Sequence, residues 1–76
     1  MDTKTILLRI DTVMERVPYK RSSIYAKVKK DKFPMPIVKK TGFVAWKEED
    51  INLYIEYLQI EDDQLKWSEF IKNINN

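Results

Sequence analysis

The positively charged side chains of this chain are numerous and closely spaced, which is typical of a site that binds anions. Six lysines and arginines lie within residues 20–32, and Lys39 and Lys40 follow shortly after. Cations gathered this densely bind phosphate groups without making or breaking covalent bonds. The alternative interpretation is a solvated basic face with no ligand.

The charge of the chain changes sign along its length. Residues 1–47 contain 12 Lys+Arg and 4 Asp+Glu, whereas residues 48–76 contain 2 and 8. The first part therefore carries +8 and the second −6, although the formal net charge is only +2. Such a split indicates a front that binds a polyanion and an acidic rear that a polyanion repels.

The composition argues against an enzyme. The chain has no histidine and no cysteine, which removes imidazole acid–base chemistry, disulfides and thiolate zinc sites. Its one glycine cannot form a phosphate-cradling loop. Glu48, Glu49 and Asp50 either hold a metal ion or begin a helix, and the helix dipole favours the second interpretation. We expect no catalytic residues, no cofactor and no metal.

Two short helices are predicted in the basic part. The first covers about residues 12–17, because Asp11 is a good N-cap and Pro18 ends it, and its apolar face is formed by Ile10, Val13, Met14 and Val17. The second covers residues 21–30, with Ile24 and Val28 facing inward and Tyr25 at the edge. Because so few residues separate them, the pair predicts a helix-turn-helix. The preceding apolar run at residues 6–8 is either a strand or the start of the first helix.

A β-hairpin is predicted after the helix pair. Residues 33–36 contain two prolines and cannot be helical. Residues 37–38 and 43–46 are β-prone, and the segment between them holds Gly42. We expect a two-stranded hairpin that serves as a wing. Trp46 at its end is expected in the core rather than as a platform for nucleobases.

Two further helices are predicted in the acidic part. One begins at Glu48 and presents Ile51, Tyr54, Ile55 and Leu58 on one face. After a polar break at residues 59–63, Asp62 or Asp63 would cap the last helix. Its apolar stripe either completes the core, or mediates self-association or docking to a partner, and consists of Trp67, Phe70, Ile71 and Ile74.

The predicted fold is mainly α with a small β-hairpin. Residues 1–60 form a winged helix-turn-helix domain, and residues 61–76 add an amphipathic C-terminal helix. The chain also lacks an apolar run near the roughly 20 residues of a membrane span, and its start does not resemble a signal peptide. We therefore expect a soluble cytoplasmic protein.

Three motifs between residues 9 and 58 resemble the AlpA family of phage and mobile-element regulators, relatives of MerR-like winged-helix proteins and some excisionases. Residues 20–25 (Lys-Arg-Ser-Ser-Ile-Tyr) are similar to the family's Ser-Arg-Ser-Thr-Ile-Tyr at the start of the recognition helix. Residues 33–36 (Phe-Pro-Met-Pro) are similar to its Phe-Pro-x-Pro before the wing, and residues 46–51 to its Trp-Arg-x-Ser-Glu-Val before the third helix. The resemblance implies a DNA-binding switch protein that controls an integrase gene or assists excision.

The chain departs from this pattern at three positions. Lys20 replaces a capping serine, Ala26 replaces a frequent arginine on the DNA-facing side, and Phe43 replaces an arginine after the wing glycine. Because both arginines are missing, the resemblance does not carry the family's base preferences over to this chain. The last sixteen residues or so lie outside the resemblance.

The expected DNA-binding residues lie on the second helix and on the wing. Arg21 is suited to two hydrogen bonds with guanine, Ser22 and Ser23 to bases or phosphates, and Ala26 to a thymine methyl group. Arg21 could instead only pair with Asp11 or Glu15, and Tyr25 could be a core residue with an exposed hydroxyl. The complete set on the helix is Lys20, Arg21, Ser22, Ser23, Tyr25, Ala26, Lys27, Lys29 and Lys30, with Lys32 beyond its end, and on the wing Lys39, Lys40 and Thr41.

The sequence thus favours a sequence-specific DNA-binding transcriptional regulator of a phage or mobile element, with an excision role as a variant of it. Its expected partners are double-stranded DNA at the nucleoid, a second copy as a homodimer or cooperative assembly on DNA, and an integrase or other protein of the element. The alternative is a protein-interaction module, an adaptor or inhibitor, that does not read DNA specifically. RNA binding is less favoured, because no aromatic pair stands on an exposed strand.

Overall fold

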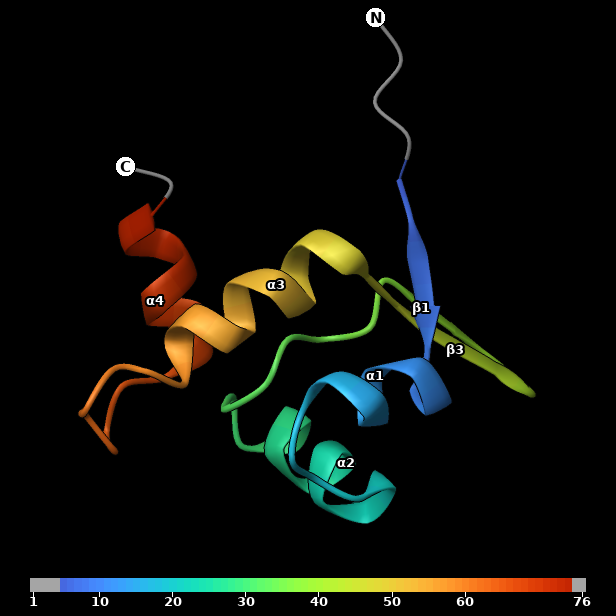
Figure 1. Cartoon of the computed structure of the whole chain (residues 1–76), viewed down its shortest axis with the longest axis horizontal. Coiled ribbons are helices and arrows are strands. Elements are labelled where there is room, and N and C mark those ends of the chain that lie inside the picture. The colour runs from blue at the N-terminus through green and yellow to red at the C-terminus, as the bar shows by residue number, and fades with distance from the viewer. Residues whose placement is uncertain (1–4, 75–76) are drawn as a thin grey trace, which may run out of the picture.

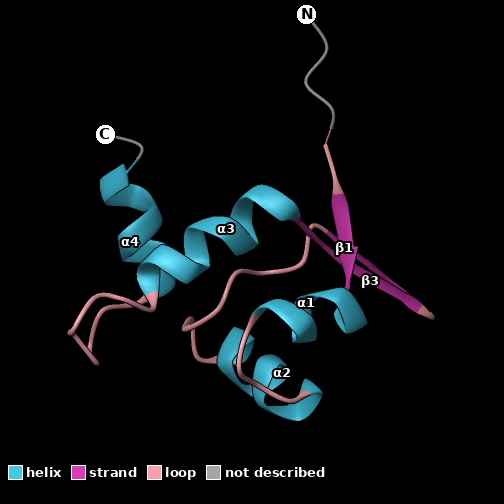
Figure 2. Ribbon diagram, viewed as in Figure 1, coloured by secondary structure: helices cyan, strands magenta, loops and turns pink. Residues whose placement is uncertain are grey.

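A small antiparallel sheet and a set of short helices make up residues 5–74, which are the part of the chain that the computed structural model describes (Figures 1 and 2). The sheet lies at one end of the molecule, and the last helix lies at the other end (Figure 1). The elements are β1 (Leu7–Arg9), α1 (Ile10–Arg16), α2 (Arg21–Lys29), β2 (Val38–Lys40), β3 (Phe43–Lys47), α3 (Glu48–Tyr57) and α4 (Trp67–Ile74).

Helices α1 and α2 form the predicted helix-turn-helix. The chain leaves α1 at Val17, whose N–H donates to the Val13 carbonyl at 3.1 Å, and Pro18 prevents the helix from continuing. The predicted start of α1 was wrong. Arg9 occupies the N-cap position without a side-chain cap, and Asp11 lies inside the first turn, because β1 leads into the helix without a loop.

The sheet has three strands, where the sequence predicted two. Its order is β1-β3-β2, and the register places Leu8 opposite Trp46. The Ile6 carbonyl accepts a hydrogen bond from the Glu48 N–H at 2.8 Å, which extends this pairing to the start of α3. The apolar run that periodicity could not assign is therefore the edge strand β1.

The wing turn is tighter than the sequence predicted. Lys40 lies opposite Phe43 in the β2–β3 ladder, so only Thr41 and Gly42 remain as the loop. Gly42 has φ 77°, a left-handed conformation that residues with a Cβ rarely adopt. Lys39 and Lys40 thus belong to strand β2 and not to the turn.

The core is centred on Trp46, which is 0% exposed, as the sequence predicted. Its indole N–H donates to the Pro34 carbonyl at 2.8 Å. Phe33 packs edge-on against it with ring centroids 6.1 Å apart, and it also contacts Tyr54 at 4.4 Å. The Phe-Pro-Met-Pro segment is therefore fixed to the core by the buried Phe33 ring and by the buried hydrogen bond to the Pro34 carbonyl.

Helix α3 is rotated relative to the predicted apolar face. Ile51 and Tyr54 are buried as expected, but Ile55 and Leu58 are 36% and 37% exposed. Tyr57 packs inward instead, because the Trp67 ring of α4 lies 5.6 Å from it and 5.9 Å from Tyr54. The position of α4 therefore decides which side of α3 is covered.

Helix α4 is capped by a residue that lies far away in the sequence. The prediction that Asp62 or Asp63 caps it was wrong. The carboxylate of Asp31 accepts hydrogen bonds from the Ser68 N–H at 3.1 Å and from the Ser68 hydroxyl. The Trp67 N–H donates to the Asp31 carbonyl at 2.7 Å.

Asp31 also ends helix α2. It has φ 60°, its N–H donates to the Val28 carbonyl, and the Lys32 N–H donates to the Lys27 carbonyl. This is the Schellman arrangement, in which glycine or asparagine usually takes the left-handed position. The left-handed conformation is less favourable for aspartate than for glycine, but the Asp31 carboxylate can cap α4, which glycine could not do.

The apolar stripe of α4 is divided between core and surface. Trp67 and Phe70 are 7% and 9% exposed and belong to the central cluster, whereas Ile74 is 46% exposed. Ile71 is half-buried and packs against the cluster. Core packing therefore accounts for the first half of the stripe, and Ile74 is its one strongly exposed member.

Candidate nucleic-acid interface

Helix α2 presents one polar, basic face to solvent. Ile24 is 0% exposed and fixes the helix on the core, with the half-buried Val28 beside it. Lys20 is the N-cap residue and gives no side-chain cap, in line with its replacing serine at this position. The exposed residues of this face are Lys20, Arg21, Ser22, Ser23, Ala26, Lys29 and Lys30.

Arg21 is paired but not buried. Its guanidinium lies 3.2 Å from the Asp11 carboxylate, and the two side chains are 59% and 82% exposed. An ion pair this exposed contributes little to stability. The pairing that the sequence left open is thus present, and the weak pair leaves Arg21 able to exchange Asp11 for another acceptor.

Three of the predicted contact residues have packing roles. The Tyr25 ring is half-buried, with its centroid 6.3 Å from that of Trp46. The Lys27 ammonium lies 4.6 Å from the centroid of the Tyr19 ring. Lys32 donates to the Asp63 carbonyl at 2.6 Å and to the Leu65 carbonyl, so it fastens the α3–α4 loop.

The wing carries its lysines on strand β2. Lys39 lies opposite Val44 and Lys40 opposite Phe43, and both lysines and Thr41 are exposed. Successive side chains of a strand point to opposite faces. The two lysines therefore border the wing on its two sides.

A hollow of about 310 Å³ separates the wing from α2. Its walls are formed by Arg9, Ile10, Asp11, Arg21, Tyr25, Gly42, Phe43 and Val44. Arg9 is exposed and was not among the predicted site residues. Its position in the wall of the hollow depends on the pairing of β1 with β3, and the sequence could not decide whether residues 6–8 form a strand.

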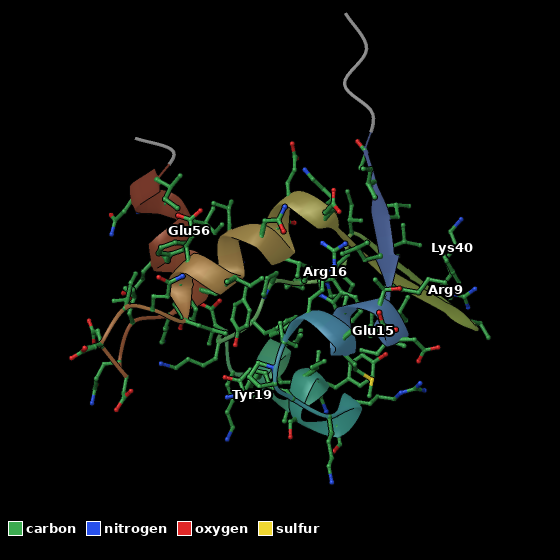
Figure 3. All side chains as sticks on the ribbon, viewed as in Figure 1. Arg9, Glu15, Arg16, Tyr19, Lys40 and Glu56 are labelled. Atoms are coloured by element: carbon green, nitrogen blue, oxygen red, sulfur yellow. The ribbon has the colours of Figure 1, made fainter. Side chains whose placement is uncertain are left out.

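Asp11 is the acidic side chain in the wall of the hollow, whereas Glu48 and Glu56 lie on α3. Glu48 begins α3 and pairs with Arg16 at 3.2 Å, so it is a helix-start residue. Figure 3 shows Glu56 at the opposite end of the molecule from Arg9 and Lys40. Within residues 5–74, no group of three acidic side chains could hold a metal ion, and no helix is long and apolar enough to cross a membrane.

Titration shifts occur in and beside the core. Burial raises the pKa of Tyr54, and a hydrogen bond to the Tyr19 side chain raises it further. Burial also raises the pKa of Asp50, against the lowering effect of nearby Lys47. None of these groups lies on the exposed face of α2 or on the β2 strand of the wing.

One comparison with known proteins is positive. The family model described as prophage CP4-57 regulatory protein (AlpA) matches residues 6–57. This segment runs from the edge of β1 to the end of α3 and so contains the helix-turn-helix and the wing. The chain has no significant match among curated proteins or among solved structures.

Proposed function

We propose a function for this chain from one premise: it belongs to the AlpA family of prophage regulatory proteins. Its role is a sequence-specific DNA-binding transcriptional regulator of a phage or mobile genetic element. The observation that carries this proposal is the exposed face of α2, which is basic and polar apart from Ala26, beside a lysine-bearing wing. Regulation by such a protein needs no catalytic group of its own.

In the proposed complex α2 enters the major groove. The N-terminal residues of a recognition helix lie nearest the base edges, which places Arg21, Ser22 and Ala26 against the bases. Lys29 and Lys30, near the other end, lie beside phosphates. The wing lysines approach the neighbouring minor groove, and their contacts add affinity without sequence information.

Selection from a random-sequence DNA library at ~150 mM salt tests this function directly. Enrichment of a defined motif, followed by a steep salt dependence on that site, is the expected result. The symmetry of the motif would also indicate whether one copy or two copies bind. Weak binding without any enriched motif would contradict sequence-specific recognition.

Replacing Arg21 with alanine is expected to cost about 1–3 kcal/mol of specific binding and to relax the preference at one base pair. Asp11→Ala is the matched control, because it breaks the same ion pair and leaves Arg21 in place. Competition between the enriched site and its single-base variants measures both effects. Equal weakening on cognate and random DNA would refute base readout by Arg21.

Replacing both Lys39 and Lys40 with alanine is expected to weaken binding on every sequence. A plot of log affinity against log salt has a negative slope, and its magnitude should decrease by at least about 0.9, the contribution of one phosphate contact. The double variant Lys66→Ala and Lys72→Ala removes two exposed lysines from the acidic part of the chain and should leave the slope unchanged. An unchanged slope in the wing variant would remove the wing from the interface.

A second candidate function is a protein-interaction module, favoured by the acidic rear and by the exposed Ile74 on α4. Its partners would be an integrase or other protein of the element, or a second copy of this chain. It predicts tight binding to a protein together with weak, sequence-blind DNA binding. An excision role would combine both functions, and each of these activities would take place in the cytoplasm, at the nucleoid.

A further inference from the structure

Three side chains form a row across the sheet on the side of the wing. Arg9 pairs with Ala45 of β3, Phe43 lies two residues before Ala45, and Lys40 lies opposite Phe43. Direct cross-strand partners and residues two apart on a strand share a face of the sheet. Arg9, Phe43 and Lys40 therefore lie on the same face, one on each of the three strands, and Figure 3 shows Arg9 and Lys40 at the same end of the molecule.

The Arg9 guanidinium is held by an aromatic ring and not by a carboxylate. Its central carbon lies 5.1 Å from the centroid of the Phe43 ring, within the distance of a cation–π contact, which favours this orientation of the side chain. Within residues 5–74 no ion pair involves Arg9, whereas Arg16 and Arg21 each have one. Arg9 thus keeps its positive charge and its hydrogen-bond donors for another partner.

Arg9 borders the hollow between α2 and the wing, where a ligand could reach its guanidinium. Arg9 and Arg21 both line it, from its β1 wall and its α2 wall. Among the described residues, Asp11 is the only acidic one in the lining, and it is engaged by Arg21. The hollow therefore offers one oriented cation and a second cation that a competing anion can recruit.

We propose that this hollow binds a backbone phosphate of DNA, with Arg9 as its principal ligand. The inference rests on the proposed function. The major groove and the adjacent minor groove of a duplex are always separated by one sugar–phosphate strand. A protein with α2 in the first groove and the wing toward the second must place the intervening surface against that strand, and this surface is the hollow. Guanidinium groups bind phosphate oxygens through two parallel hydrogen bonds.

Replacing Arg9 with alanine tests the assignment. Affinity for the enriched site and for random DNA should fall by a similar factor, about tenfold, because a phosphate contact is sequence-independent. The salt slope should fall by about 0.9. Arg9→Lys should restore the slope, since it restores the charge, and Phe43→Leu should weaken binding less and leave the slope unchanged.

Arg16→Ala is the matched control, because it removes the same side chain at a position already paired with Glu48. It should leave the salt slope as in the wild type, and thermal unfolding of each variant shows whether the fold is retained.

An unchanged salt slope in Arg9→Ala, or a loss of affinity confined to the enriched site, would overturn the phosphate assignment. The proposed regulator function would still be supported if the wild-type protein selects a motif. If the wild-type protein binds random DNA but no motif is enriched, sequence-specific recognition is refuted. The phosphate assignment can still be tested in that case, by a salt titration of Arg9→Ala on random DNA. No DNA binding at all refutes both.

Discussion

A Trp46→Ala protein is expected to lose a large part of its stability. Deleting a buried tryptophan side chain costs about 3–5 kcal/mol, while a domain of 76 residues has a total stability of about 4–11 kcal/mol. The substitution also leaves the buried Pro34 carbonyl without its indole donor. Thermal unfolding followed by circular dichroism should show a midpoint at least about 15 °C lower, or no cooperative transition.

Met35→Ala is the control for this loss, since it shortens a neighbouring apolar side chain that is 70% exposed. Its unfolding midpoint should stay close to that of the wild type. Trp46→Phe separates the two contributions, because it keeps most of the ring volume and removes only the donor. If Trp46→Ala unfolded like the wild type, the position of Trp46 at the centre of the core would be wrong.

Ala26→Glu is expected to abolish DNA binding. Ala26 is exposed in the middle of the proposed reading face of α2, where a carboxylate would meet base edges and phosphates at close range. Like charges brought together in an interface cost several kcal/mol, so affinity should fall on the order of 100-fold or more. Fluorescence anisotropy with the enriched site and with random DNA measures this loss.

Asn73→Glu is the matched variant, because it adds the same charge at an exposed position of another helix, α4. At physiological salt its effect on DNA should be small, since the screening length is only about 8 Å. Circular dichroism confirms that both variants fold. Equal DNA affinities for the two variants would exclude the exposed face of α2 as the contact surface.

Much of the helix-turn-helix and the wing could be predicted from short-range patterns. Pro18 ends α1 whatever its surroundings, and the spacing of Ile24 and Val28 defines the inner side of α2. Gly42 marks the wing turn because the left-handed conformation there suits a residue without a Cβ. Each of these features depends on the residue itself or on neighbours within one helical turn.

The features that sequence analysis missed depend on residues far apart in the chain. Strand β1 is only three residues long, and its partner β3 follows more than thirty residues later, so the local pattern of residues 6–8 could not identify it. The cap of α4 comes from Asp31, 37 positions before Ser68. The buried side of α3 was misassigned for the same reason, since Trp67 of α4 determines it.

The candidate site shows the same division. The exposure of Ser22, Ser23 and Ala26 follows from helical periodicity and could be predicted, whereas Arg21 shares the side of Ile24 and Val28 and is exposed because it lies in the first turn, paired with Asp11. The engagement of Lys32 with the α3–α4 loop could not, because a lysine after a basic helix looks the same in the sequence whether it is free or bound to carbonyls. Arg9 was missed because its neighbour Phe43 is brought near only by the β1–β3 pairing.

Asp31 connects helices α2 and α4. One residue ends α2 and accepts the hydrogen bonds that cap α4, so a ligand that displaced α4 from Asp31 and thereby changed the end of α2 would also change the DNA affinity proposed for that helix. Linkage requires reciprocity: the factor by which such a ligand changes DNA affinity equals the factor by which DNA changes the ligand's affinity. Part of the segment beyond the family match, helix α4, is thereby connected through Asp31 to the helix proposed to read DNA.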